Sequence, residues 1–117
     1  MPHYLIYFNQ QWVGDHPEEW FATRVEPSMA VVKEMRDAGV LVFGGGLEQD
    51  APVYAADATS GEVLVTDGPY VETKEVLGGF VVVDVPDDES AKSWAAKVAV
   101  GCGWPQEVRR FSPEPEL

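Results

Sequence analysis

Short apolar runs alternate with helix-period stripes along this chain of 117 residues. Runs rich in aromatic and β-branched residues, bounded by Gly, Pro, Asn and Asp, predict strands. The predicted strands span residues 4–8, 40–43, 53–58, 62–66, 80–85 and 107–111. The third and fourth of these flank Thr59-Ser60-Gly61, which predicts a β-hairpin.

The first helical segment follows Pro17 and contains a second proline, Pro27. Because proline lacks an N–H and its ring clashes with the preceding turn, we expect a short helix over 17–24 and a main helix over 27–38. The apolar stripe expected on the main helix consists of Val31, Met35 and Ala38. Gly39 stands where a left-handed C-terminal cap is needed.

The second helical segment follows Pro86, with Asp87 as the expected N-terminal cap. Its inward stripe, at i, i+3, i+4 and i+7, consists of Ala91, Trp94, Ala95 and Val98. The order of elements is therefore β-α-β, a hairpin and β-α-β. This order predicts an α+β fold of the ferredoxin-like, split βαβ kind, with both helices on one face of an antiparallel sheet. The length suits one domain over 1–117, whose Pro- and Glu-rich tail, 112–117, is expected to fray.

The strand over 80–85 is apolar on both of its faces, with Val81 and Val83 on one side and Phe80 and Val82 on the other. The first strand repeats this pattern. A sheet face that meets water carries polar residues at alternate positions, so a strand apolar on both sides is expected to be buried on both. We expect a second copy to cover the second face in a two-fold homodimer, a dimeric α+β barrel. The alternative is that the tail or the connection after the first strand folds over it.

The amino-acid composition limits the classes of molecule that this protein is expected to bind. The formal net charge is -12, from 20 acidic and 8 basic residues, which argues against nucleic acid and anionic membranes as partners. The single cysteine, Cys102, forms no intrachain disulfide and is expected to be an unreactive thiol, and no Cys/His cluster predicts a metal or another cofactor. The N-terminal apolar run is too short for a signal peptide or membrane span, so we expect a cytoplasmic protein.

The stretch Asp67–Glu75, with the sequence DGPYVETKE, is the most specific in the chain. Gly68 before Pro69 predicts a shaped turn, and Asp67 suits the formation of that turn. Asp67, Glu72 and Lys74 are candidate acid/base residues, because a buried cluster of opposite charges shifts the pKa values of its members. The alternative is a solvated, salt-bridged loop, which is the usual role of a short charged run.

Other residues are candidates for a ligand pocket beside this turn. They are Tyr70, Glu75, Gly78, Gly79 and Arg109. The two glycines permit close approach of a backbone or ligand, and Arg109 suits an anion. Trp12, Trp20 and Trp104 suit either a cleft wall or, more often, the core or an interface. The triplet Gly44–Gly46 lacks the Lys-Ser/Thr of a phosphate loop and predicts a bulge or tight bend.

The Asp67–Glu75 stretch resembles the signature of the DGPFAETKE family, a branch of the YciI-like (YCII-related) proteins, and departs from it at Tyr70 and Val71. Further similar stretches are Ala38-Gly39-Val40-Leu41, Gly45-Gly46-Leu47, Leu77-Gly78-Gly79-Phe80, Asp84-Val85-Pro86-Asp87 and Trp94-Ala95-Ala96. The resemblance implies a ferredoxin-like fold, a dimeric α+β barrel with a cleft in each subunit, an association with bacterial sigma-factor genes, and no agreed activity. Some relatives use a His–Asp pair with the His on the first main helix, where this chain has Ser28 and Met29.

Three functions remain open from the sequence. The first is a small-molecule-binding dimeric barrel with a regulatory or accessory role. The second is a cofactor-free monooxygenase, isomerase or lyase that uses Asp67, Glu72 and Lys74 on a small organic substrate, for which fold analogy is the warrant. The third is a protein-interaction module without a ligand.

Overall fold

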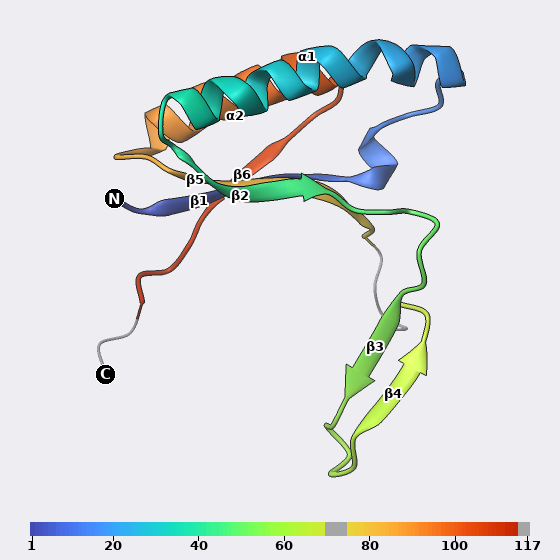
Figure 1. Cartoon of the computed structure of the whole chain (residues 1–117). Coiled ribbons are helices and arrows are strands. Elements are labelled where there is room, and N and C mark those ends of the chain that lie inside the picture. The colour runs from blue at the N-terminus through green and yellow to red at the C-terminus, as the bar shows by residue number, and fades with distance from the viewer. Residues whose placement is uncertain (70–74, 115–117) are drawn as a thin grey trace.

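Four strands form one antiparallel sheet in the order β2-β5-β1-β6, and two helices cover one of its faces (Figure 1). The computed structural model describes residues 1–69 and 75–114. In chain order its elements are β1 (His3–Asn9), the 3-10 turn η1 (Gln10–Trp12), α1 (Glu18–Asp37), β2 (Leu41–Gly46), β3 (Tyr54–Asp57), β4 (Leu64–Asp67), β5 (Leu77–Asp84), α2 (Asp88–Cys102) and β6 (Glu107–Arg110). Strand β5 separates β1 from β2, and β1 separates β5 from β6, so the two βαβ units interlock. This is the expected ferredoxin-like α+β fold.

Strands β3 and β4 form the predicted hairpin as a separate two-stranded sheet. Figure 1 shows this hairpin on the side of the main sheet away from the helices. At its turn the Asp57 carboxylate accepts hydrogen bonds from the Thr59 amide and hydroxyl, both at 2.8 Å, which lower the pKa of Asp57. The hairpin ends at Gly68, whose φ of 97° suits glycine.

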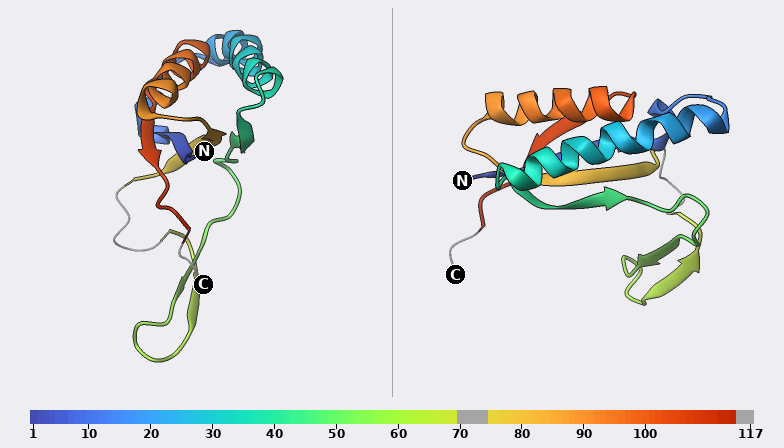
Figure 2. Two further views of the ribbon diagram at one scale, coloured as in Figure 1. Left: turned by 90° about the vertical axis from the view of Figure 1, so that its left-hand side faces the viewer. Right: turned by 45° about the horizontal axis from the view of Figure 1, so that its top comes forward.

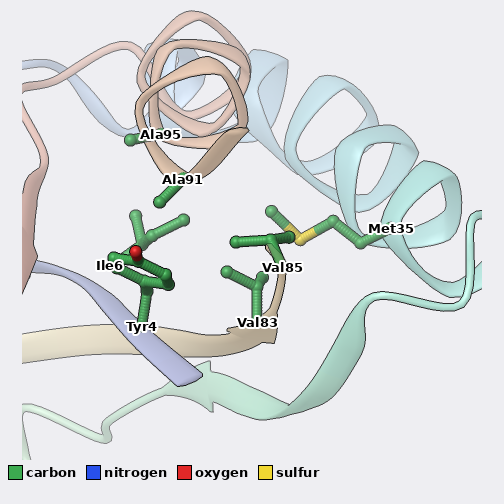
Figure 3. Packing of buried hydrophobic residues seen from close by; sticks show 7 residues of the cluster. All are labelled: Tyr4, Ile6, Met35, Val83, Val85, Ala91 and Ala95. Atoms are coloured by element: carbon green, nitrogen blue, oxygen red, sulfur yellow. The ribbon is translucent and has the colours of Figure 1, made fainter. Parts of the chain in front are cut away.

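The core lies between the helices and the inner face of the sheet (Figure 3). Its buried members are Tyr4, Ile6, Met35, Val83, Val85, Ala91 and Ala95. The expected stripe of α2 is confirmed, because Trp94 and Val98 pack against this cluster. On α1 the stripe is shorter than predicted: Met35 is buried and Val31 is half-buried, but Ala38 is exposed because it lies at the C-cap, past the last helical residue.

Helix α1 runs without a break through Pro27, so the predicted division into 17–24 and 27–38 is wrong. A proline inside a helix removes one hydrogen bond, and packing on a neighbour compensates for that loss. The neighbour is α2, where a Cβ on Gly101 would lie 2.9 Å from the Pro27 carbonyl oxygen. The two helices therefore approach closely at a point where each has a residue unusual inside a helix. Figure 2 shows them side by side above the sheet.

The prediction of a bend or bulge at Gly44–Gly46 is also wrong, because all three glycines lie in β2 and pair with Val81, Phe80 and Gly79. The irregularity lies earlier. The pairing register of β2 against β5 shifts between Leu41 and Phe43, so that β2 has one extra residue there. The glycine triplet is thus regular strand without side chains.

The second face of the sheet is apolar, as the sequence pattern predicts. Strand pairing aligns Leu5, Val82 and Phe43 across it, and next to them Tyr7 and Phe80. The Phe43 side chain is 66% exposed, and its ring centroid lies 6.1 Å from that of Phe80. We call these five residues the outer sheet face. Among the described residues Trp12 of η1 packs on Tyr7, with ring centroids 6.1 Å apart, but α1 and α2 both lie on the other face of the sheet (Figure 2).

Helix α2 has a cap at each end. The Ser90 amide donates to the Asp87 carboxylate at 2.8 Å, and Gly103 ends the helix with a φ of 94°. The hydrogen bond from Ser90 lowers the pKa of Asp87. Both the predicted cap at Asp87 and the left-handed glycine expected at Gly39, with a φ of 72°, are confirmed.

We expect Gly101→Ala to destabilise the protein, because the added Cβ would force α1 and α2 apart. Overpacking costs about 1–3 kcal/mol, against a gain of about 1 kcal/mol in helix propensity. A net loss of about 1 kcal/mol is expected from urea unfolding. Val100→Ala, at the exposed neighbouring position, is the control and should be near neutral. A Gly101→Ala protein as stable as the wild type would contradict the close helix contact.

We expect Asp87→Ala to lower the melting temperature by a few degrees at neutral pH, while Asp87→Asn, which keeps a capping oxygen, stays close to the wild type. The folded-state pKa of Asp87 is lowered, so its contribution is present above the unfolded value of 3.8 and is lost as the pH falls below it. The gap in urea midpoint between wild type and Asp87→Ala should therefore shrink below that pH. A gap that is constant down to acidic pH would show that the charged cap is not responsible.

Candidate functional site

A cavity of about 380 Å³ lies between α1, the end of α2 and the inner face of the sheet. This volume lies within the range typical of small-molecule sites. Met29 and Val32 of α1 contribute to one wall, and Phe8 and Val81 of the sheet contribute to the opposite one. The walls are therefore mostly apolar.

The glycine triplet of β2 helps to keep this cavity open. All three glycines border it, and a Cβ on Gly46 would meet no atom within 4 Å. A larger residue at this inner-face position would extend into the open volume. The absence of side chains along this part of β2 thus leaves space between the sheet edge and α1.

Polar groups are few in the lining. Among the described lining residues Arg36 alone carries a charge, and it is exposed. The Ser28 hydroxyl donates to the Val25 carbonyl within α1 at 3.0 Å. Two further polar side chains, Trp104 and Gln106, follow α2. Their nitrogens, Nε1 and Nε2, are buried and have no hydrogen-bond partner in the described part of the chain.

The Trp104 ring is held by aromatic neighbours. Its centroid lies 5.1 Å from that of Phe8 and 6.2 Å from that of Trp20. Trp20 in turn stacks on His16, with ring centroids 3.6 Å apart. These contacts connect the start of α1 to the segment after α2, so Trp104 is fixed in the cavity wall.

Cys102 also borders the cavity. Burial raises the pKa of its thiol, and the nearby Arg24 charge opposes this only in part. The thiol therefore remains protonated at neutral pH, as expected for an unreactive cysteine.

The residues singled out around the Asp67 turn do not line this cavity where the structure describes them. Asp67 is exposed at the end of β4, and Glu75 is exposed before β5. Arg109 is exposed and pairs with Leu5, beside the outer sheet face. Tyr70, Glu72 and Lys74 lie outside the described residues. The roles assigned to all six stay predictions.

Gly78 and Gly79 are buried, and their close neighbour is the chain itself. A Cβ on Gly78 would lie 2.2 Å from the Phe8 ring, and one on Gly79 would lie 3.0 Å from both that ring and the Gly46 backbone. The expected close approach is therefore made by Phe8 and Gly46. Whether a ligand also reaches these glycines stays a prediction.

Sequence reasoning missed Gln106 and the α1 wall of the cavity. Gln106 had no motif around it. Ser28 and Met29 were noted only because they occupy the place of the His used by some relatives, and both border the cavity. A possible signal was the glycine triplet, since a strand that lacks side chains on its buried face leaves volume that its neighbours must fill or a ligand can occupy.

Within 1–69 and 75–114 no three His, Cys, Asp or Glu side chains gather as a metal site requires. Neither helix in the described part of the chain combines the length and apolar character needed to cross a bilayer.

Comparison with known proteins identifies the family of this chain. A family model for the YCII-related domain matches residues 5–104, which run from β1 through Trp104 and include most of the cavity lining. No curated protein matches the chain. The family match covers far more than half of the sequence and supports the resemblance seen in the Asp67–Glu75 motif. This chain belongs to the YCII-related domain family.

Proposed function

We propose that this protein binds a small, mostly apolar molecule in the cavity between α1 and the sheet. The observation that carries the proposal is a cavity of about 380 Å³ with mostly apolar walls and a few polar groups, the usual character of a ligand site. Removal of apolar surface from water supplies the affinity. Binding of this kind suits a regulatory or accessory protein.

A cofactor-free enzyme is the less favoured alternative. General acid–base chemistry needs a titratable group within hydrogen-bond reach of the reacting atoms. The described lining contains no carboxylate, imidazole or amine, and its thiol has a raised pKa. The candidate acid Asp67 is exposed on the hairpin. These observations favour binding over catalysis in this cavity.

We also propose that two copies of the chain associate through the outer sheet face. That face is apolar on three adjacent strands, and a two-fold dimer covers identical patches with each other. The exposed side chains of the β3–β4 hairpin also support association with a second copy. Its side chains Tyr54, Val63 and Val65 are 64%, 73% and 67% exposed, and an isolated two-stranded hairpin has only marginal stability in water. Because the hairpin projects on the side of the outer sheet face (Figure 1), a second copy there is placed to contact both.

A pure interaction module would share this surface but would not use the cavity. The two functions can therefore be distinguished by substitution. A substitution in the cavity that leaves the outer sheet face unchanged should affect ligand binding, and a substitution on the outer sheet face should affect the association of subunits.

We expect Gly46→Leu to weaken binding of the neutral fluorescent probe N-phenyl-1-naphthylamine by about tenfold or more, because the leucine occupies the cavity. The fold should be kept, since the added side chain meets no atom at its Cβ. Ala96→Leu, on the exposed face of α2, is the control and should bind like the wild type. If the wild type does not bind the probe, or Gly46→Leu binds it equally well, the cavity is not the ligand site.

We expect the wild type to sediment at micromolar concentration with twice the subunit mass of 12.9 kDa. Phe43→Asp should give the single-subunit mass, because a carboxylate would be buried in the apolar contact. Val100→Asp places the same charge on a side chain that is 78% exposed on α2, and should remain a dimer. A wild type that sediments as one subunit would refute the proposed association.

A further inference from the structure

The cavity opens to solvent between α1 and β2. Of the described residues that line it, the exposed ones belong to these two elements: Met29 and Arg36 of α1, and Gly44–Gly46 of β2. The other described lining residues are buried or half-buried. Arg36 is therefore the one charged side chain that the described lining places at the opening, and the glycines of β2 carry no side chains that would obstruct the approach.

The Arg36 side chain is not needed to cap its own helix. A basic side chain in the last turn of a helix can satisfy the final carbonyl groups. In α1 the backbone does this, because the carbonyls of Met35 and Arg36 accept hydrogen bonds, both 3.0 Å long, from the two amides that follow the C-cap. The guanidinium is thus available for another acceptor.

The acidic side chains beside Arg36 in the sequence are paired with lysines. Asp37 accepts a hydrogen bond from Lys33 at 2.7 Å within α1, and Glu34 forms an ion pair with Lys97 of α2. Within residues 1–69 and 75–114 no carboxylate forms an ion pair with Arg36. The N–H donors of its guanidinium are therefore left to water or to a ligand.

We propose that the ligand is a monocarboxylate whose apolar body lies in the cavity and whose carboxylate binds Arg36 at the opening. This inference rests on the proposed function. Ser28, Val32 and Arg36 follow one another at four-residue intervals, so they share a face of α1, and all three border the cavity. A guanidinium binds a carboxylate through two parallel hydrogen bonds, which suits this ligand class.

The net charge of -12 is compatible with this contact. Charges exposed to solvent are screened beyond about 8–10 Å at physiological ionic strength, and the acids nearest to Arg36 in the sequence are neutralised by their lysine partners. A single carboxylate needs one cation, whereas a polyphosphate chain needs several. The local arrangement around Arg36 therefore decides whether a small anion binds.

Matched probes separate the charge from the apolar body. The probes 2-naphthoate and 2-naphthamide have nearly the same shape, and only the first is negatively charged at neutral pH. Displacement of N-phenyl-1-naphthylamine measures the affinity of each for wild type, Arg36→Gln and Lys33→Gln. Lys33→Gln is the matched control, because it removes the same charge from the same helix at a residue that is 73% exposed and does not border the cavity.

We expect Arg36→Gln to weaken binding of 2-naphthoate by about threefold or more, as an ion pair at the protein surface allows. Binding of 2-naphthamide should change by less than about twofold, because the amide carries no charge. Lys33→Gln should bind both probes like the wild type. The effect of Arg36→Gln on 2-naphthoate should also shrink in 1 M salt, where screening acts over about 3 Å.

A spectroscopic readout locates the contact. In a nitrogen–proton correlation spectrum, the Nε–H signal missing from Arg36→Gln identifies Arg36. Addition of 2-naphthoate should move that signal further than addition of 2-naphthamide, since the charged acceptor forms the stronger hydrogen bond.

The outcomes separate the two proposals. The carboxylate inference is overturned, and the apolar site stands, if Arg36→Gln binds 2-naphthoate as the wild type does, or if 2-naphthamide binds and 2-naphthoate does not. Equal weakening of both probes would assign Arg36 a structural role, and equal weakening by Lys33→Gln would assign the effect to net charge; either result also overturns the inference. Failure of every probe, N-phenyl-1-naphthylamine included, refutes the proposed function itself.

Discussion

The contact between α1 and α2 at Pro27 and Gly101 is the constraint on which the rest of the inner face depends. It lets a helix containing a proline lie close against its neighbour. On either side of this contact, Ser28 and Val31 of α1 and Val98 and Cys102 of α2 border the cavity. Because α1 packs on α2 above the glycine half of β2, the space over Gly44–Gly46 is left unfilled. The cavity is thus a product of helix packing as much as of the glycines below it.

The sheet presents two apolar faces with different surroundings. The inner face is covered by helices and filled by Tyr4, Ile6, Val83 and their neighbours, apart from the cavity. The outer face has no such cover in the described chain. The proposed ligand site and the proposed dimer contact therefore lie on opposite sides of the same four strands. The two sites meet at Phe80 of β5, which belongs to the outer sheet face and also borders the cavity.

The groups that line the cavity suit the proposed binding of a ligand better than catalysis. The described lining contains few polar side chains and one exposed cation, and its thiol is protonated at neutral pH. Such a set offers no carboxylate, imidazole or amine for proton transfer among the described residues. Asp67, the first residue of the acidic motif, lies apart from the cavity lining, at the end of β4.

The sequence by itself determined the order of elements, the ferredoxin-like class, the cap at Asp87 and the two-sided apolar strands. These are local properties, set by periodicity, turn chemistry and single capping residues. Only the tertiary structure decided that α1 continues through Pro27 and that Gly44–Gly46 form a strand. It alone brought Trp104 and Gln106 to a cavity with Phe8 and Met29. Each of these depends on residues distant in the chain, because a cavity and a helix contact are volumes left by packing, which no local pattern of residues specifies.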